Sequence, residues 1–151
     1  MKEMKPRLQL SKLNEGMTLP KLEKVVTQEK INLYAQASRD FNPIHIDPDF
    51  AGKTPLGGTI AHGMLILAYV SQMMTAAFGQ SWLSQGTLSV RFRAPARPGD
   101  TITISGKISK VAKSQNETLI SCEVLCANQN GESVITGETQ VRVKERREWR
   151  Y

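Results

Sequence analysis

A helix built from residues 64–78 is apolar on nearly every side. This segment is too short to cross a bilayer, and a helix without a polar face is stable in water only when other elements cover it. Gly79 follows directly, at a position where a glycine commonly ends a helix. The sequence therefore predicts one long central helix that the rest of the chain buries.

After this segment the hydrophobic period changes from helical to two. Four segments alternate apolar and polar residues, as half-buried strands do, and turn-like sequences separate them. The segments are residues 88–94, 101–108, 120–126 and 135–143, and the turns are residues 95–100, 114–116 and 128–131. Short connections between successive strands favour antiparallel pairing. We therefore predict an α+β fold in which an antiparallel β-sheet wraps around the long central helix.

The first half of the chain carries weaker signals. Residues 17–26 read as a ragged first strand, and Thr27 is a plausible N-cap for a helix with Glu29 in its first turn. The Asn42-Pro43 pair disfavours continuation of that helix, because a residue before proline avoids the α region. A second cap, Asp47, precedes one short turn that runs through Ala51.

The chain has 151 residues, of which 40% are hydrophobic and 23% charged, and no repeat or linker divides it. This composition is typical of a globular protein. We expect a single domain over residues 1–151, with a core at about 14–144 and a charged tail at 145–151. The N-terminus lacks the apolar run of a signal peptide, so we expect a cytoplasmic protein without a membrane partner.

The net charge of +6 raises the question of a nucleic-acid partner. Much of the basic excess lies at the chain ends, and no aromatic-and-basic motif accompanies it, so we expect no nucleic acid. The surface is either simply solvated or attracts a phosphate-bearing thioester. Cys122 and Cys126 lie on one face of a strand, roughly 13 Å apart, which is too far for a disulfide. We expect buried thiols and no metal site, since no clustered histidines or CxxC pair accompany them.

The residues best suited to chemistry lie between the first helix and the central one. Asp40 and His45 are five residues apart around the Asn42-Pro43 corner, and His62-Gly63 comes directly before the central helix. A carboxylate and an imidazole on one corner can hold and deprotonate a water. A glycine N–H at a helix start can stabilise a developing oxyanion. These parts suit addition of water to, or its removal from, a carbonyl-conjugated substrate.

Three blocks of the chain resemble those of a known family. Asp40-Phe41-Asn42-Pro43-Ile44-His45, with Tyr34 before it and Asp47-Pro48 and Phe50-Ala51 after it, resembles the signature of the MaoC-like, (R)-specific enoyl-CoA hydratases. Ile60-Ala61-His62-Gly63-Met64-Leu65 is similar to the second block of that family, and the passage from Phe92 to Pro98-Gly99-Asp100 is similar to a third. The resemblance extends from about residue 14 to residue 144.

The resemblance implies a hot-dog fold and a homodimer that joins two sheets edge to edge. It implies reversible hydration of trans-2-enoyl-CoA, or dehydration of (R)-3-hydroxyacyl thioesters, on coenzyme A or acyl carrier protein, without a cofactor. Asp40 and His45 match the catalytic dyad, and Gly63 matches the residue whose N–H binds the thioester oxygen. Asn42, His62 and Arg39 are candidate substrate-binding residues. Asn42 and His62 also have structural interpretations, at the corner and near the helix start.

Two positions depart from the family pattern. Many relatives carry glycine where this chain has Arg39, whose side chain either faces the site or reaches solvent or a coenzyme A phosphate. Some relatives carry a serine at the position of Ala68, and Ser71 is a partial substitute. Two other functions stay open: a hot-dog acyl-CoA thioesterase, which residues 64–78 disfavour because they contain no Asp or Glu, and a non-catalytic acyl-CoA-binding module, which an intact dyad disfavours.

Overall fold

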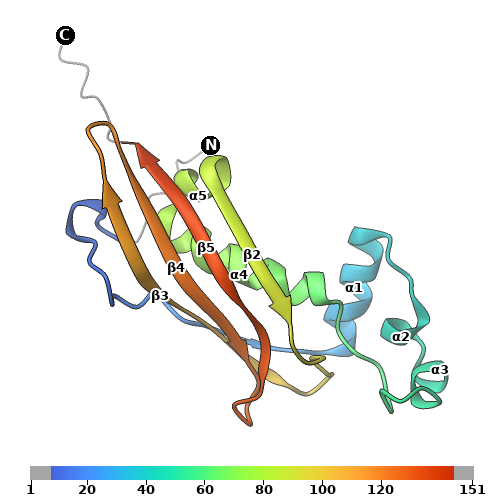
Figure 1. The fold of residues 1–151 in the computed structure, drawn as a ribbon. Coiled ribbons are helices and arrows are strands. Elements are labelled where there is room, and N and C mark those ends of the chain that lie inside the picture. Colours follow the sequence, from blue (N-terminus) through green and yellow to red (C-terminus); the bar gives the residue numbers. More distant parts are fainter. Residues whose placement is uncertain (1–7, 145–151) are drawn as a thin grey trace.

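The computed structural model describes residues 8–144. A five-stranded antiparallel sheet, in the order β1-β3-β4-β5-β2, curves around one long helix, α4 (Figure 1). The strands are β1 (Leu22–Val25), β2 (Gly86–Phe92), β3 (Thr101–Lys113), β4 (Glu117–Ala127) and β5 (Ser133–Lys144). The helices are η1 (Leu10–Lys12), α1 (Gln28–Ser38), α2 (Pro43–Ile46), α3 (Pro48–Gly52), α4 (Gly63–Phe78) and α5 (Gln80–Gln85). The predicted α+β architecture, a hot-dog fold, is confirmed.

The core lies between the inner face of the sheet and α4. The strand register aligns Ile104, Cys126 and Ile135 in one row across β3, β4 and β5, and all three are fully buried. Seven residues of α4 are buried: Leu65, Ile66, Val70, Met73, Met74, Ala77 and Phe78. Full burial of one such large apolar side chain contributes about 1.5–3 kcal/mol. The alternation along β3, β4 and β5 therefore fixes which sheet face packs on α4, whereas Leu88 and Phe92 of β2, predicted on the buried face, are exposed.

The helix ends follow the cap residues of the sequence, with one addition. Thr27 caps α1 by accepting a hydrogen bond from the N–H of Lys30, as predicted. Gly79 ends α4 at φ 58°, and the chain then enters α5, which the sequence pattern did not predict. A glycine reaches this positive φ without a steric penalty, so the chain turns sharply from one helix into the next. Trp82 of α5 packs back into the core.

Three helices, α1, α2 and α3, lie together at the N-terminal end of α4, beyond the sheet (Figure 1). The single turn α2 was also not predicted as a helix. Asn42 caps it by accepting from the N–H of Ile44, and Pro43 is its first residue. The pair expected to prevent further helix therefore starts a new turn, whereas α1 already ends before it, at Arg39. Asp47 caps α3 as predicted. This cluster carries the candidate site residues that precede α4.

Other expectations concern the cysteines, the chain ends and the membrane. Cys122 and Cys126 are free and buried, which confirms the prediction of unpaired thiols. The charged tail predicted at residues 145–151 and the basic residues before Leu8 lie outside the described residues. Within residues 8–144, no helix combines the length and apolarity that a membrane crossing requires.

Candidate active site

Asp40 and His45 face each other across a short gap. The Nε2 atom of His45 lies 4.0 Å from Oδ2 of Asp40. The His45 side chain is almost buried, whereas the Asp40 side chain is 53% exposed, so solvent reaches the carboxylate. A water placed about 2.8 Å from both atoms fits this gap at hydrogen-bonding distance. The structure thus brings together the two residues that the sequence singled out.

Asp40 follows directly on the last turn of α1. The preceding residue, Arg39, ends α1 with φ 62° in the left-handed region. The N–H of Asp40 donates to Oγ of Ser38 (3.3 Å), and the N–H of Asn42 donates to Oδ1 of Asp40 (3.2 Å). The second carboxylate oxygen, Oδ2, is the one directed at His45. Local hydrogen bonds therefore orient the carboxylate toward the imidazole.

His45 is held by the segment that precedes α4. Its Nδ1–H donates to the carbonyl oxygen of Ile60 (2.8 Å), and the N–H of Ile60 donates to the carbonyl of Ile44 (3.1 Å). Because a carbonyl oxygen only accepts, the proton of the neutral ring lies on Nδ1, and the Nε2 lone pair faces Asp40. The first two sequence blocks are joined here. The N–H of Ala61 donates to the carbonyl of Ala96 (2.7 Å), which joins the third.

Gln28 is a site residue that the sequence did not indicate. Its Nε2 donates to the main-chain carbonyl of His45 (2.7 Å), and its Oε1 accepts from Oγ1 of Thr59 (2.7 Å). Gln28 thereby ties α1 to α2 and to the segment before α4. A single glutamine in the first turn of a helix carries no local signal for such a contact.

His62 lies behind the dyad and is only 2% exposed. Its ring stacks on that of His45, with centroids 3.8 Å apart and planes at 27°, and contacts the Tyr34 ring at 4.9 Å. Its Nε2–H donates to the main-chain carbonyl of Asp40 (3.0 Å). Asn42 is occupied as the cap of α2. Arg39 is exposed and makes no ion pair within residues 8–144.

Gly63 begins α4 directly after His62. The N–H groups of a first helical turn have no acceptor within the helix, and the helix dipole makes them favourable for negative charge. A β-carbon on Gly63 would lie 2.8 Å from Cε1 of Phe92, so the glycine keeps the helix start close to β2. A cavity of about 410 Å³ adjoins this point. Its lining is mostly apolar: Leu56, Ile60, Ala61, Gly63, Ile66, Phe92, Arg93, Ala94, Pro95, Ala96, Val134 and Ile135.

Ala68 and Ser71 lie further along α4. The Ser71 hydroxyl accepts a hydrogen bond from the indole N–H of Trp82 (2.9 Å). Ser71 therefore bonds to α5, and not to the residues around the first turn of α4.

The donor atoms at the dyad do not suit a metal ion. Asp40, His45 and His62 offer ligand atoms within 4.8 Å of one another. However, Nδ1 of His45 and Nε2 of His62 already bond main-chain carbonyls. The two rings are also stacked, so their in-plane lone pairs do not converge on one point. The arrangement instead favours proton transfer.

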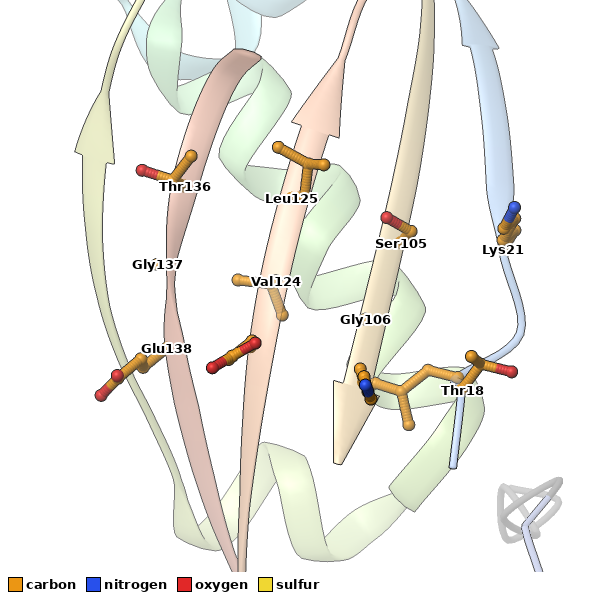
Figure 2. A pocket seen from close by; sticks show the side chains of 12 residues that line it. Thr18, Lys21, Ser105, Gly106, Val124, Leu125, Thr136, Gly137 and Glu138 are labelled. Carbon is orange, nitrogen blue, oxygen red and sulfur yellow. The ribbon is translucent and has the colours of Figure 1, made fainter. Parts of the chain in front are cut away.

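A larger hollow, about 600 Å³, lies on the sheet face opposite α4. Figure 2 shows Ser105, Leu125 and Thr136 side by side across β3, β4 and β5, with α4 behind the sheet. Neither Asp40 nor His45 lines this hollow. Its lining contains no histidine, so it lacks the pairing of a carboxylate with an imidazole that Asp40 and His45 provide.

Comparisons with known proteins cover most of the chain. The MaoC like domain model matches residues 12–144. The (R)-specific enoyl-CoA hydratase of Rhodospirillum rubrum is 31% identical over 137 residues, which cover 89% of this chain and 90% of that relative. The mitochondrial 3-hydroxyacyl-(acyl-carrier-protein) dehydratase of Arabidopsis thaliana is 32% identical over 117 residues, covering 76% and 69%.

A solved structure gives the same result for the fold. The (R)-hydratase from A. caviae involved in PHA biosynthesis superposes with a TM-score of 0.75 at 26% identity, covering 86% of this chain and 96% of that one. The sheet order, the central helix and the family match agree with one another. The chain therefore belongs to the MaoC-like domain family of hydratases and dehydratases, built on the hot-dog fold.

Proposed function

We propose that the protein catalyses the reversible hydration of trans-2-enoyl thioesters to (R)-3-hydroxyacyl thioesters, with Asp40 and His45 as the catalytic dyad. The observation that carries this proposal is the 4.0 Å gap between Nε2 of His45 and Oδ2 of Asp40. Both atoms are acceptors when His45 carries its proton on Nδ1. Two acceptors on either side of one water orient it and withdraw its proton.

In the hydration direction, the water oxygen forms a bond to C3 of the enoyl group while its proton moves to Nε2 of His45. The electron pair of the C2–C3 double bond shifts toward the thioester, and the carbonyl oxygen becomes an enolate. The proton on Nε2 then passes to C2 on the same face, which regenerates neutral His45. The Asp40 carboxylate holds the water and stabilises the transient imidazolium. Dehydration is the same path in reverse.

Gly63 supplies the complementary group for the thioester oxygen. Its N–H stands at the first turn of α4, where the helix dipole and the unpaired donors favour an enolate oxygen. One oxyanion donor is typically worth about 10²–10³ in kcat. The neighbouring cavity of about 410 Å³ offers an apolar environment for part of the acyl thioester.

A homodimer joined through β2 accompanies this proposal. Strand β2 is an edge of the sheet, and it exposes Leu88 and Phe92. An unpaired edge with exposed apolar side chains favours pairing with another chain. Light scattering during size-exclusion chromatography is expected to give twice the chain mass, and Leu88→Glu is expected to shift it toward the monomer. A wild-type monomer at high concentration contradicts this pairing.

The activity is tested by the loss of the conjugated-enoyl absorbance of crotonyl-CoA, with chiral analysis of the alcohol. We expect the (R)-alcohol, and a decrease of roughly 10²-fold or more for Asp40→Asn and for His45→Ala. Asp47→Asn is the matched control, because it removes a nearby charge while an asparagine can still cap α3. Octenoyl-CoA and a carrier-protein-linked enoyl substrate then define the range. Release of free coenzyme A indicates a thioesterase, and binding without turnover indicates a binding module.

A further inference from the structure

The buried imidazole of His62 contacts both members of the dyad. Its Nε2–H donates to the main-chain carbonyl of Asp40 at 3.0 Å, and its ring stacks on that of His45 at 3.8 Å. The main chain of Asn42 also bonds both residues, through its N–H to Oδ1 of Asp40 and its carbonyl to the N–H of His45. Among the side chains of residues 8–144, His62 is the one hydrogen-bonding or stacking partner that Asp40 and His45 share. The segment holding His62 is 22 residues from Asp40 in the sequence. A residue distant in the sequence therefore contacts both members of the local pair.

The dyad needs such a support because its own elements are short. His45 lies on α2, which has only four residues, and a single helical turn is not stable without tertiary contacts. Asp40 lies in the irregular segment between α1 and α2. The Tyr34 ring contacts His62 as well. Three rings in contact, with Tyr34 tilted against His62 at 57° and His62 stacked on His45, thus join α1, the start of α4 and α2.

The protonation pattern of His62 suits this position. Its Nε2 carries a proton, because that atom donates to a carbonyl. Its Nδ1 is buried and has no hydrogen-bond partner within the described residues. A neutral ring under His45 leaves His45 free to become positive during turnover without repulsion from a like charge. It also offers a π-face to that cation.

We propose that His62 is a positioning residue that sets the separation between Oδ2 of Asp40 and Nε2 of His45. As the residue that precedes Gly63 at the start of α4, it also ties the dyad to the oxyanion donor. The inference rests on the hydratase activity proposed above. It differs from the substrate contact predicted from sequence, because a side chain that is 2% exposed offers almost no surface to a ligand.

Two variants separate the two contacts. His62→Phe keeps an aromatic ring against His45 and loses the hydrogen bond to Asp40, whereas His62→Gln keeps a side-chain N–H donor and loses the stack. For each variant we expect kcat to fall between about tenfold and about 10²-fold, because a misplaced catalytic group costs roughly 10²-fold. We expect KM to change much less than kcat. Ile120→Val is the control. Ile120 is a fully buried residue of β4, so we expect this substitution to lower the melting temperature and to leave kcat unchanged.

A double-mutant cycle with Asp40→Asn distinguishes positioning from a general structural role. If His62 acts through the dyad, its variants lose little further activity once Asp40 is replaced. Losses that multiply in that background overturn the proposal. So do a kcat within threefold of wild type, or a KM that rises at constant kcat, which indicates substrate contact instead.

One readout does not depend on activity. The chain has two histidines, so in a His62 variant the only imidazole resonances belong to His45. We expect the Nδ1 proton of His45 to exchange with water faster in both variants than in wild type and in Ile120→Val. If the Nδ1 proton of His45 exchanges at the wild-type rate in both variants, the positioning role is overturned, whether or not the wild-type protein has hydratase activity. An inactive wild-type protein, by itself, rejects only the proposed function.

Discussion

The Nδ1 atom of His45 lies 2.8 Å from the carbonyl oxygen of Ile60. This contact comes from a residue fifteen positions away in the chain, and it determines which nitrogen of the His45 imidazole is left without a proton in the neutral ring. With the proton held on Nδ1, the lone pair on Nε2 points across the gap to Asp40. Main-chain geometry outside the signature block thus leaves Nε2 of His45 available as an acceptor, as the proposed mechanism requires.

The tautomers of the two histidines are therefore opposite. For the neutral form of each ring, we expect ¹⁵N shifts that place the His45 proton on Nδ1 and the His62 proton on Nε2. Both assignments follow from donation to carbonyl oxygens. Long-range ¹H–¹⁵N NMR measures them, and His45→Ala assigns the two rings. A proton on Nε2 of His45 contradicts its role as acceptor and transfers that role to Asp40.

The start of α4 is packed too closely for a β-carbon at Gly63. A methyl there would lie 2.8 Å from Cε1 and 3.0 Å from Cδ1 of Phe92. Phe92 is 54% exposed, so its ring can move and we expect Gly63→Ala to fold. The expected cost is a kcat about tenfold lower or more, because the helix start and its N–H shift. Phe92→Ala removes the ring that the added methyl would contact. We therefore expect kcat of the double variant Gly63→Ala/Phe92→Ala to be close to kcat of Phe92→Ala alone.

An unchanged kcat in Gly63→Ala means that the close approach to Phe92 has no effect on the oxyanion donor. A circular dichroism spectrum and a melting curve show whether the variant has kept the fold. If Phe92→Ala does not recover activity in the double variant, the added methyl acts on the substrate directly.

Much of the fold follows from the sequence because each element has one buried face. The period of two in residues 120–126 predicts β4, since alternate side chains meet α4 and solvent. The cap residues Thr27 and Asp47 predict helix starts, because each side chain accepts a main-chain N–H within three residues. By contrast, α5 was missed because Gly79 marks a helix end equally well whether a loop or another helix follows.

The site was only partly predictable for a similar reason. Asp40 and His45 are close in sequence, so their pairing around Asn42-Pro43 follows from local geometry. The contacts of Gln28 with His45 and Thr59 span 17 and 31 residues. The stack of His62 on His45 is likewise a product of how α4 meets α2. No local pattern encodes such contacts, because they arise only when distant elements pack.

Arg39 occupies a backbone conformation that favours glycine. A residue with a β-carbon is destabilised by about 1–2 kcal/mol at this φ of 62°. A glycine avoids that strain, but part of the gain is offset because the unfolded chain has more conformational entropy with glycine at this position. We expect Arg39→Gly to raise the free energy of unfolding by up to about 1 kcal/mol. Arg39→Ala keeps the strain and removes the same charge, so it is not expected to stabilise.

The same two variants test whether Arg39 binds substrate. A shared rise in KM for acyl-CoA, larger at low ionic strength, indicates that the guanidinium contacts a phosphate. An unchanged KM in both assigns the side chain to solvent. Urea denaturation at one pH gives the stability difference, and equal stability of the Gly and Ala variants contradicts the strain argument.

The buried cysteines predict a loss of stability in alkaline solution. Burial raises the pKa of the Cys122 thiol from 9.0 to about 11, although a hydrogen bond with Thr139 opposes this, and burial raises the pKa of Cys126 to about 12. Unfolded thiols therefore lose protons at lower pH than folded ones, and the unfolded state binds fewer protons above about pH 9. Their contribution to stability is complete below that pH and is lost as pH rises through 11 and 12.

We therefore expect the free energy of unfolding to fall more steeply above pH 9 in wild type than in Cys122→Ala/Cys126→Ala, since both proteins share every other titrating group. A native-state reaction with an aromatic disulfide reagent near pH 8 is expected to be at least about a hundredfold slower than in urea, because the thiolate is the reactive form. Parallel pH profiles of the two proteins, or rapid labelling of the folded chain, would show that these thiols reach solvent. The control is the double variant itself, which takes up no reagent in either state.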